Sequence, residues 1–167
     1  MKIPTVKVKE LRDQSGAGIM ECRNVLSEVA GDMGKALEVL KQRNLLKAQK
    51  KAERSAFQGI IEAYIHTGGR IGAMVEVNCE TDFVARTKEF KELAHNLAMQ
   101  VAATNPQFIS KEEAPEGNDI EPETDCLLLQ PYIKDPAQSI QDIITGSIAK
   151  MGENIKVNRF ERFELGS

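Results

Sequence analysis

The sequence is poor in histidine, cysteine and aromatic residues. It has no tryptophan, two tyrosines, two histidines and three cysteines in 167 residues. His66 and His95 lie far apart in the sequence and the cysteines form no CxxC pair, so we expect neither a metal site nor a cofactor. The phosphate-binding P-loop and the motifs GxGxxG, HExxH and GxSxG are also absent. This argues against an enzyme that performs chemistry on its own substrate.

The chain also lacks the features of an exported, membrane-spanning or general nucleic-acid-binding protein. No apolar run approaches the ~20 residues that a membrane span requires, and the N-terminus has no signal-peptide core. An odd number of cysteines fits free thiols in a reducing compartment. A net charge of −3 provides no dominant basic surface for nucleic acid. We therefore expect a cytoplasmic protein with neither nucleic acid nor membrane as a partner.

Residues 1–44 contain three short segments with the apolar spacing of helices. We expect Thr5 to cap the first segment and Gly16 to end it, the second to cover about residues 18–30, and Asp32 to cap the third. Their apolar residues recur every three or four positions, which predicts a small three-helix module. These residues are Val8, Leu11, Met20, Val25, Leu26, Val29, Met33, Ala36, Leu37 and Leu40.

The loop between the first two predicted helices places Ile19 and Met20 directly after two glycines. A module of this size needs most of its apolar residues for its core, which favours burial of both side chains. The other interpretation is an exposed apolar tip that grips a partner. The residues alone leave both interpretations open.

A basic stretch follows the module, and we interpret residues 45–56 as a helical linker. Positive charges outnumber the single acid, Glu53, in this segment. Such a run is typical of a solvated helix and is less typical of a nucleic-acid contact.

Residues 57–80 are typical of a β-hairpin. Apolar and polar residues alternate from Ile71 to Cys79, as in a strand with one buried face. Gly68-Gly69 provides the positive φ angles of a two-residue turn. Cys79 falls on the buried face, and its acidic neighbours disfavour a thiolate, so we interpret it as a core residue.

The remaining residues complete an α+β core of antiparallel strands packed with helices, which we assign to residues 57–167. Residues 87–103 predict an amphipathic helix, and the acidic segment 111–126 has the composition of a flexible loop. Asp135-Pro136 is a favourable helix start, with Gly152 at the end of that helix. A strand closes the chain, and its apolar phase shifts between Val157 and Phe160, which a β-bulge or a twist of the strand would explain.

Between the hairpin and the helix lies the sequence Thr81-Asp82-Phe83-Val84, in which neither period accounts for an acid beside a large aromatic residue. One interpretation is that Phe83 packs the following helix onto the core. The other is a protruding wedge: Phe83 enters a partner's pocket and Asp82 meets a polar group beside it.

Several blocks of the sequence, in the same order, resemble the bacterial elongation factor Ts family. They are residues 8–12 (VKELR), 15–20 (SGAGIM), 66–72 (HTGGRIG), 75–86 (VEVNCETDFVAR), 131–135 (PYIKD), 152–155 (GENI) and 159–160 (RF). The resemblance implies a guanine nucleotide exchange factor for the translational GTPase elongation factor Tu. It also implies that residues 1–44 form a ubiquitin-associated-like module.

The same resemblance implies roles for two groups of residues. Thr81, Asp82, Phe83 and Val84 would form the wedge, which enters beside the Mg²⁺ ion that bridges the phosphates of GDP. Arg12, Ile19 and Met20 would contact the GTPase domain. Longer relatives carry a second core subdomain where this chain has only the acidic segment. The resemblance therefore implies a short form, in which a homodimer would supply a second copy of the core.

Two functions of other classes remain open. One is a non-catalytic adaptor whose three-helix module binds a protein partner without nucleotide exchange. The other is a thiol-dependent enzyme that uses Cys79.

Overall fold

Three helices form the N-terminal part of the chain, as the apolar spacing predicted. They are α1 (Thr5–Ser15), α2 (Ile19–Glu28) and α3 (Met33–Lys51). Leu11, Val25 and Leu40 lie at the centre of their shared core. Asp32 caps α3 by accepting a hydrogen bond from the backbone N–H of Lys35, as predicted.

The ends of α1 agree only in part with the prediction. Gly16 ends the helix in the left-handed conformation, at φ 67°. The prediction that Thr5 caps the helix is wrong, because Thr5 is already helical and Pro4 occupies the cap position without a side-chain hydrogen bond. At the C-terminal end of the module, α3 continues to Lys51, so most of the basic stretch is part of this helix.

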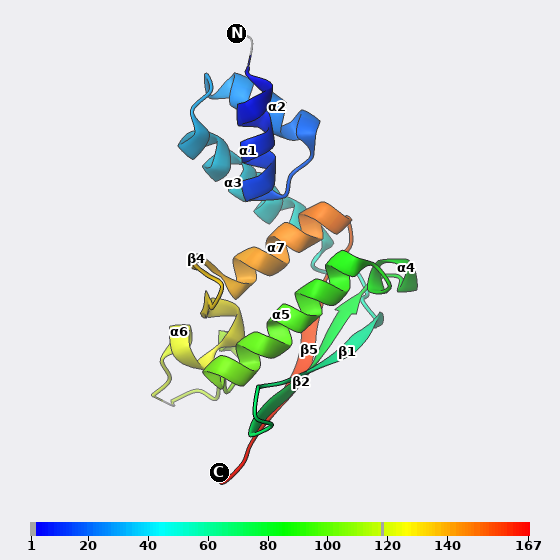
Figure 1. The fold of residues 1–167 in the computed structure, drawn as a ribbon, viewed down its shortest axis with the longest axis vertical. Coiled ribbons are helices and arrows are strands. Elements are labelled where there is room, and N and C mark those ends of the chain that lie inside the picture. The colour runs from blue at the N-terminus through cyan, green and yellow to red at the C-terminus, as the bar shows by residue number, and fades with distance from the viewer. Residues whose placement is uncertain (1–2, 118) are drawn as a thin grey trace. The chain divides into compact units, whose positions relative to one another are not determined.

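The computed structural model describes residues 3–117 and 119–167, and it confirms the expected α+β class (Figure 1). The chain divides into two compact units. The first comprises Met1–Arg54 and Thr145–Glu153, and the second comprises Ser55–Ile144 and Asn154–Ser167. No helix in the described part of the chain is long and apolar enough to cross a membrane.

An antiparallel sheet is the centre of the second unit. Its strands are β1 (Gln58–Ile65), β2 (Ile71–Cys79) and β5 (Lys156–Glu164), in the order β1-β2-β5. Helix α5 (Lys88–Thr104) crosses one face of the sheet (Figure 1). The β2 residues that alternate toward α5 are buried, including Cys79, as predicted. The predicted bulge is confirmed, because the β2–β5 register shifts between Glu76 and Val77.

Helix α7 (Ile140–Met151) begins four residues later than predicted. The Asp135-Pro136 pair lies in strand β4 (Asp135–Ser139), which pairs with the short strand β3 (Pro131–Tyr132). Ser139 and Asp142 explain the observed start. The N–H of Asp142 donates to the hydroxyl of Ser139 at 3.1 Å, and the N–H of Ser139 donates to the carboxylate of Asp142 at 3.0 Å. This reciprocal cap replaces the predicted one.

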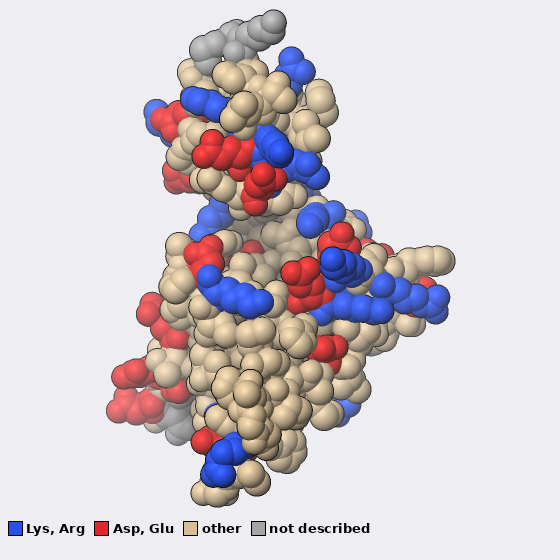
Figure 2. All heavy atoms as spheres, viewed as in Figure 1, with Lys and Arg blue, Asp and Glu red and all other residues tan. Residues whose placement is uncertain are grey.

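The acidic segment contains local structure that its composition did not indicate. It includes the helical turns η1 (Lys111–Glu113) and α6 (Pro122–Asp125), and η2 (Leu127–Leu129) follows. The backbone carbonyl of Asp125 accepts hydrogen bonds from the N–H groups of Gln107 and Phe108, at 2.8 and 3.0 Å. Figure 2 shows acidic side chains gathered over this part of the second unit.

Candidate protein-interaction site

The chain leaves β2 and enters α4 (Asp82–Ala85), a helix of one turn that presents Phe83 to solvent. The Phe83 side chain is 78% exposed. The interpretation that Phe83 packs the next helix onto the core is therefore wrong. Asp82 and Val84 beside it are half-buried. The structure thus presents an aromatic side chain next to a carboxylate at one protruding turn.

Two threonines hold α4 at its ends. The hydroxyl of Thr81 accepts a hydrogen bond from the N–H of Val84 at 3.4 Å. The hydroxyl of Thr87 donates to the carbonyl of Val84 at 2.7 Å and accepts from the N–H of Phe90 at 3.2 Å, so it ends α4 and begins α5. Because both caps are side chains next to the turn, the local sequence specifies where α4 starts and stops.

Asp82 has a partner one helical turn away. Its carboxylate lies 3.0 Å from the guanidinium of Arg86; the Arg86 side chain is exposed and that of Asp82 is about half exposed. An exposed pair of this kind adds little stability. It does hold the carboxylate of Asp82 on the outer side of the turn, where a partner's polar group can reach it.

A second exposed apolar feature lies on the three-helix module. Ile19 is 55% exposed and Met20 is 63% exposed at the start of α2, so the interpretation of both as core residues is wrong. Arg12, near the end of α1, is exposed as well. The three residues of the module that the sequence analysis named therefore all reach solvent.

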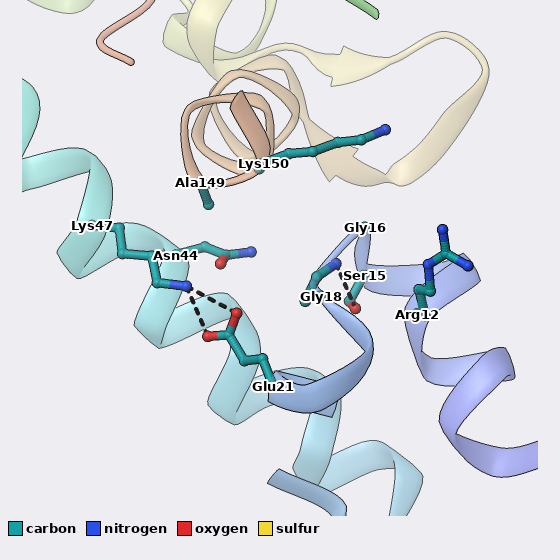
Figure 3. Close-up of a pocket in the computed structure, with 11 residues that line it drawn as sticks. Arg12, Ser15, Gly16, Gly18, Glu21, Asn44, Lys47, Ala149 and Lys150 are labelled. Carbon is teal, nitrogen blue, oxygen red and sulfur yellow. Dashed lines mark hydrogen bonds and ion pairs between the residues drawn. The ribbon is translucent and has the colours of Figure 1, made fainter. Parts of the chain in front are cut away.

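The loop that presents Ile19 and Met20 is fixed from within. The hydroxyl of Ser15 donates to the carbonyl of Leu11 at 2.6 Å and accepts from the N–H of Ala17 at 3.2 Å. A pocket opens beside this loop, and Arg12 is among the residues around it (Figure 3). The ion pair between Lys47 and Glu21, at 2.8 Å, joins α3 to the first turn of α2 (Figure 3).

The cysteines and histidines are poorly placed for catalysis. All three cysteines are buried. The thiol of Cys79 donates to the carbonyl of Thr81 at 3.1 Å, and burial raises the pKa of the Cys126 thiol. His95 lies 3.0 Å from Glu62. The Nδ1 atom of His66 lies 3.0 Å from the hydroxyl of Tyr64, two residues earlier on the same side of the strand. Among residues 3–117 and 119–167, no group of three or more potential ligands could hold a metal ion.

The sequence analysis missed an apolar surface on the face of the sheet opposite α5. Its large apolar members come from all three strands, and each is at least 48% exposed. Phe163 of β5 lies opposite Gly72, next to Ile65 of β1 and Met74 of β2. We call this the open sheet face, defined by Ile61, Ile65, Met74 and Phe163. Ile61, Ala63 and Ile65 lie at every second position of β1 and so share one face of the strand, which is the signal that could have revealed this surface.

Comparison with known proteins places the chain among translation elongation factors. The family model described as "Elongation factor TS" matches residues 7–125. Elongation factor Ts of Carboxydothermus hydrogenoformans is 45% identical over 194 residues, which cover 98% of this chain and 89% of that protein. Elongation factor Ts of Moorella thermoacetica is 44% identical over 194 residues (98% and 96%), and that of Thermodesulfovibrio yellowstonii is 45% identical over 196 residues (99% and 98%).

This chain belongs to the elongation factor Ts family. The alignments are longer than the chain's 167 residues, so these relatives carry residues that have no counterpart here.

Proposed function

We propose that this chain is a guanine nucleotide exchange factor for elongation factor Tu, and that α4 is the wedge that promotes GDP release. The observation that carries the proposal is Phe83, which stands exposed at a capped turn beside Asp82. An aromatic side chain held outward beside a carboxylate matches the anchors that a partner's pocket buries at an interface. Membership of the family supports elongation factor Tu as that partner, and its action would lie in the cytoplasm, where translation takes place.

The proposed mechanism needs no catalytic group in this chain. A bound nucleotide in a GTPase is held by a Mg²⁺ ion and by backbone N–H groups around its phosphates. Phe83 would occupy a pocket beside that site, and Asp82 would compete for polar groups that support the ion. Because the factor and GDP favour different states of the GTPase, each would weaken binding of the other by the same factor.

This reciprocity separates an exchange factor from an adaptor. Titration calorimetry would compare binding of the chain to nucleotide-free and to GDP-loaded elongation factor Tu. We expect the nucleotide-free form to bind at least about tenfold more tightly, the typical scale of such coupling. Equal affinity for the two forms would instead support the adaptor.

A second contact, through Arg12, Ile19 and Met20, would strengthen binding to elongation factor Tu without raising the maximal rate of GDP release. We expect the double variant Ile19→Asp/Met20→Asp to raise the concentration for half-maximal GDP release by about tenfold or more, because two exposed apolar anchors are lost. The maximal release rate would change little, since α4 is intact.

Val6→Asp is the matched control, because Val6 is an exposed apolar residue of the same module. A half-maximal concentration that is unchanged in the double variant, or raised equally by Val6→Asp, would contradict this role.

The open sheet face supports a further proposal, that two copies of the chain form a homodimer through it. Ile65 and Phe163 are each 66% exposed, and Met74 lies between their strands. Pairing two such faces would bury apolar surface that α5 leaves uncovered.

We expect sedimentation equilibrium to give twice the monomer mass for the wild type and the monomer mass for Ile65→Glu/Phe163→Glu. Leu129→Glu changes an exposed apolar residue elsewhere in the same unit, and it should leave the dimer intact. A wild-type monomer at concentrations of tens of micromolar would exclude this interface.

A further inference from the structure

The turn that carries Phe83 is too short to define its own direction. Helix α4 has four residues, and a helix of this length gains few hydrogen bonds for the backbone freedom that it loses. Its backbone hydrogen bonds include two at the long end of the usual range, 3.3 Å from the N–H of Ala85 to the carbonyl of Thr81 and 3.2 Å from the N–H of Arg86 to that of Asp82. The orientation of Phe83 must therefore depend on what holds the residues on either side.

Several hydrogen bonds at this turn are local. The side-chain bonds of Thr81, Thr87 and Cys79 described above each join residues within three positions of each other. Local bonds of this kind fix the shape of the turn. The bond of Cys79, the last residue of β2, also joins the turn to the sheet, but only at the strand that leads directly into the turn.

Glu80 makes a contact of a different kind. Its carboxylate accepts a hydrogen bond from the backbone N–H of Asn154 at 2.6 Å, across 74 residues of sequence. Asn154 is 2% exposed and lies two residues before β5, the neighbour of β2 in the sheet. A charged acceptor on a buried N–H group makes one of the stronger hydrogen bonds in proteins. Glu80 thereby joins the start of the turn to the core of the second unit.

We infer that Glu80 is a positioning residue for the wedge. It holds the segment Thr81-Asp82-Phe83 at a fixed angle to the sheet, so that Phe83 meets the partner already oriented. This role rests on the proposed function of α4. Preorganisation of this kind changes the rate of an assisted step, because the productive geometry is then populated before the partner binds.

The variants follow from the chemistry of the acceptor. Glu80→Ala removes the acceptor and leaves the N–H of Asn154 without it. Glu80→Gln retains an oxygen at the same reach, in a neutral bond. Glu80→Asp keeps the charge but shortens the side chain, so its carboxylate cannot reach Asn154. Glu92→Ala is the control, because Glu92 is an exposed acid on α5 of the same unit.

The first test is the rate of GDP release from elongation factor Tu as a function of factor concentration. We expect Glu80→Ala and Glu80→Asp to lower the maximal rate by about tenfold, with the half-maximal concentration unchanged. Glu80→Gln should stay within about threefold of the wild type in maximal rate, and Glu92→Ala should equal it. A folded Glu80→Ala variant with the wild-type maximal rate, or a Glu80→Gln variant as impaired as Glu80→Ala, would overturn the inference. If Glu80→Ala does not fold, Glu80→Asp decides in the same way.

The second test does not depend on exchange. The chain has no tryptophan and two tyrosines, so Phe83→Trp introduces a single tryptophan at the wedge, which is excited selectively at a wavelength that tyrosine does not absorb. We expect its fluorescence anisotropy to fall when Glu80→Ala is added, because the turn loses its attachment to the core, and to stay constant with Glu92→Ala. An unchanged anisotropy would overturn the positioning role. If the anisotropy falls but the wild-type chain does not accelerate GDP release, the Glu80–Asn154 attachment stands and the proposed exchange function is rejected.

Discussion

Replacement of Phe83 by alanine is expected to lower the maximal rate of GDP release from elongation factor Tu by about 30-fold. This factor corresponds to ~2 kcal/mol, the lower limit for an aromatic anchor at the centre of an interface. The fold should be unaffected, because a side chain that is 78% exposed contributes little to the core. The measurement is stopped-flow release of a fluorescent GDP, together with a thermal melt of each variant.

Phe57→Ala is the matched control for this prediction. Phe57 is 88% exposed and belongs to the same unit as Phe83, so the same chemical change is made at a second exposed aromatic residue. The Phe57→Ala variant should promote GDP release from elongation factor Tu at the same maximal rate as the wild type. If Phe83→Ala promoted GDP release at the wild-type maximal rate, or if both variants lowered that rate equally, Phe83 would have no specific role in the mechanism.

Replacement of Gly59 by alanine is expected to cause the largest loss of stability among single substitutions considered in this chain. A Cβ atom at this position would lie 2.1 Å from the carbonyl oxygen of Val77 and 2.8 Å from the Cα of Asn78, and the backbone φ angle is 147°. Both atoms belong to the backbone of β2, so β1 would have to move away from its partner strand. We expect a loss of about 3 kcal/mol, or a fall of about 5–10 °C in melting temperature.

Gly146→Ala is the matched control, with the opposite expected sign. Gly146 lies inside α7, and a Cβ atom there would meet nothing within 4 Å. Alanine in a helix interior is favoured over glycine by about 0.5–1 kcal/mol. A Gly59→Ala variant that melts at or above the wild-type temperature would contradict the close approach of β1 and β2.

Regular packing explains what the sequence predicted well. The stripe of α5 and the alternation of β2 each follow from one buried face, which is visible in a single segment. The irregularity in β5 was visible for the same reason: the shift in apolar phase between Val157 and Phe160 fitted a bulge or a twist, and the register of the sheet shows the bulge.

The errors concern residues whose environment depends on other segments. An aromatic residue after a strand fits both a packed and a protruding turn, so the exposure of Phe83 required the structure. Asp135-Pro136 is compatible with a helix start, but the reciprocal bonds of Ser139 and Asp142 begin α7 later. The contact of Glu80 with Asn154 joins residues that only the fold brings together. The open sheet face was not predicted because β1 has apolar residues on both of its faces, so its sequence does not show which face is exposed.

The central claim is that this chain accelerates the release of GDP from a translational GTPase. The most direct measurement follows fluorescent GDP leaving elongation factor Tu, with unlabelled GDP in excess, while the concentration of the wild-type chain is raised. We expect a release rate that rises with concentration and then saturates well above the spontaneous rate. A rate that stays at the spontaneous value, while the two proteins still bind each other, would contradict it and leave the adaptor as the function.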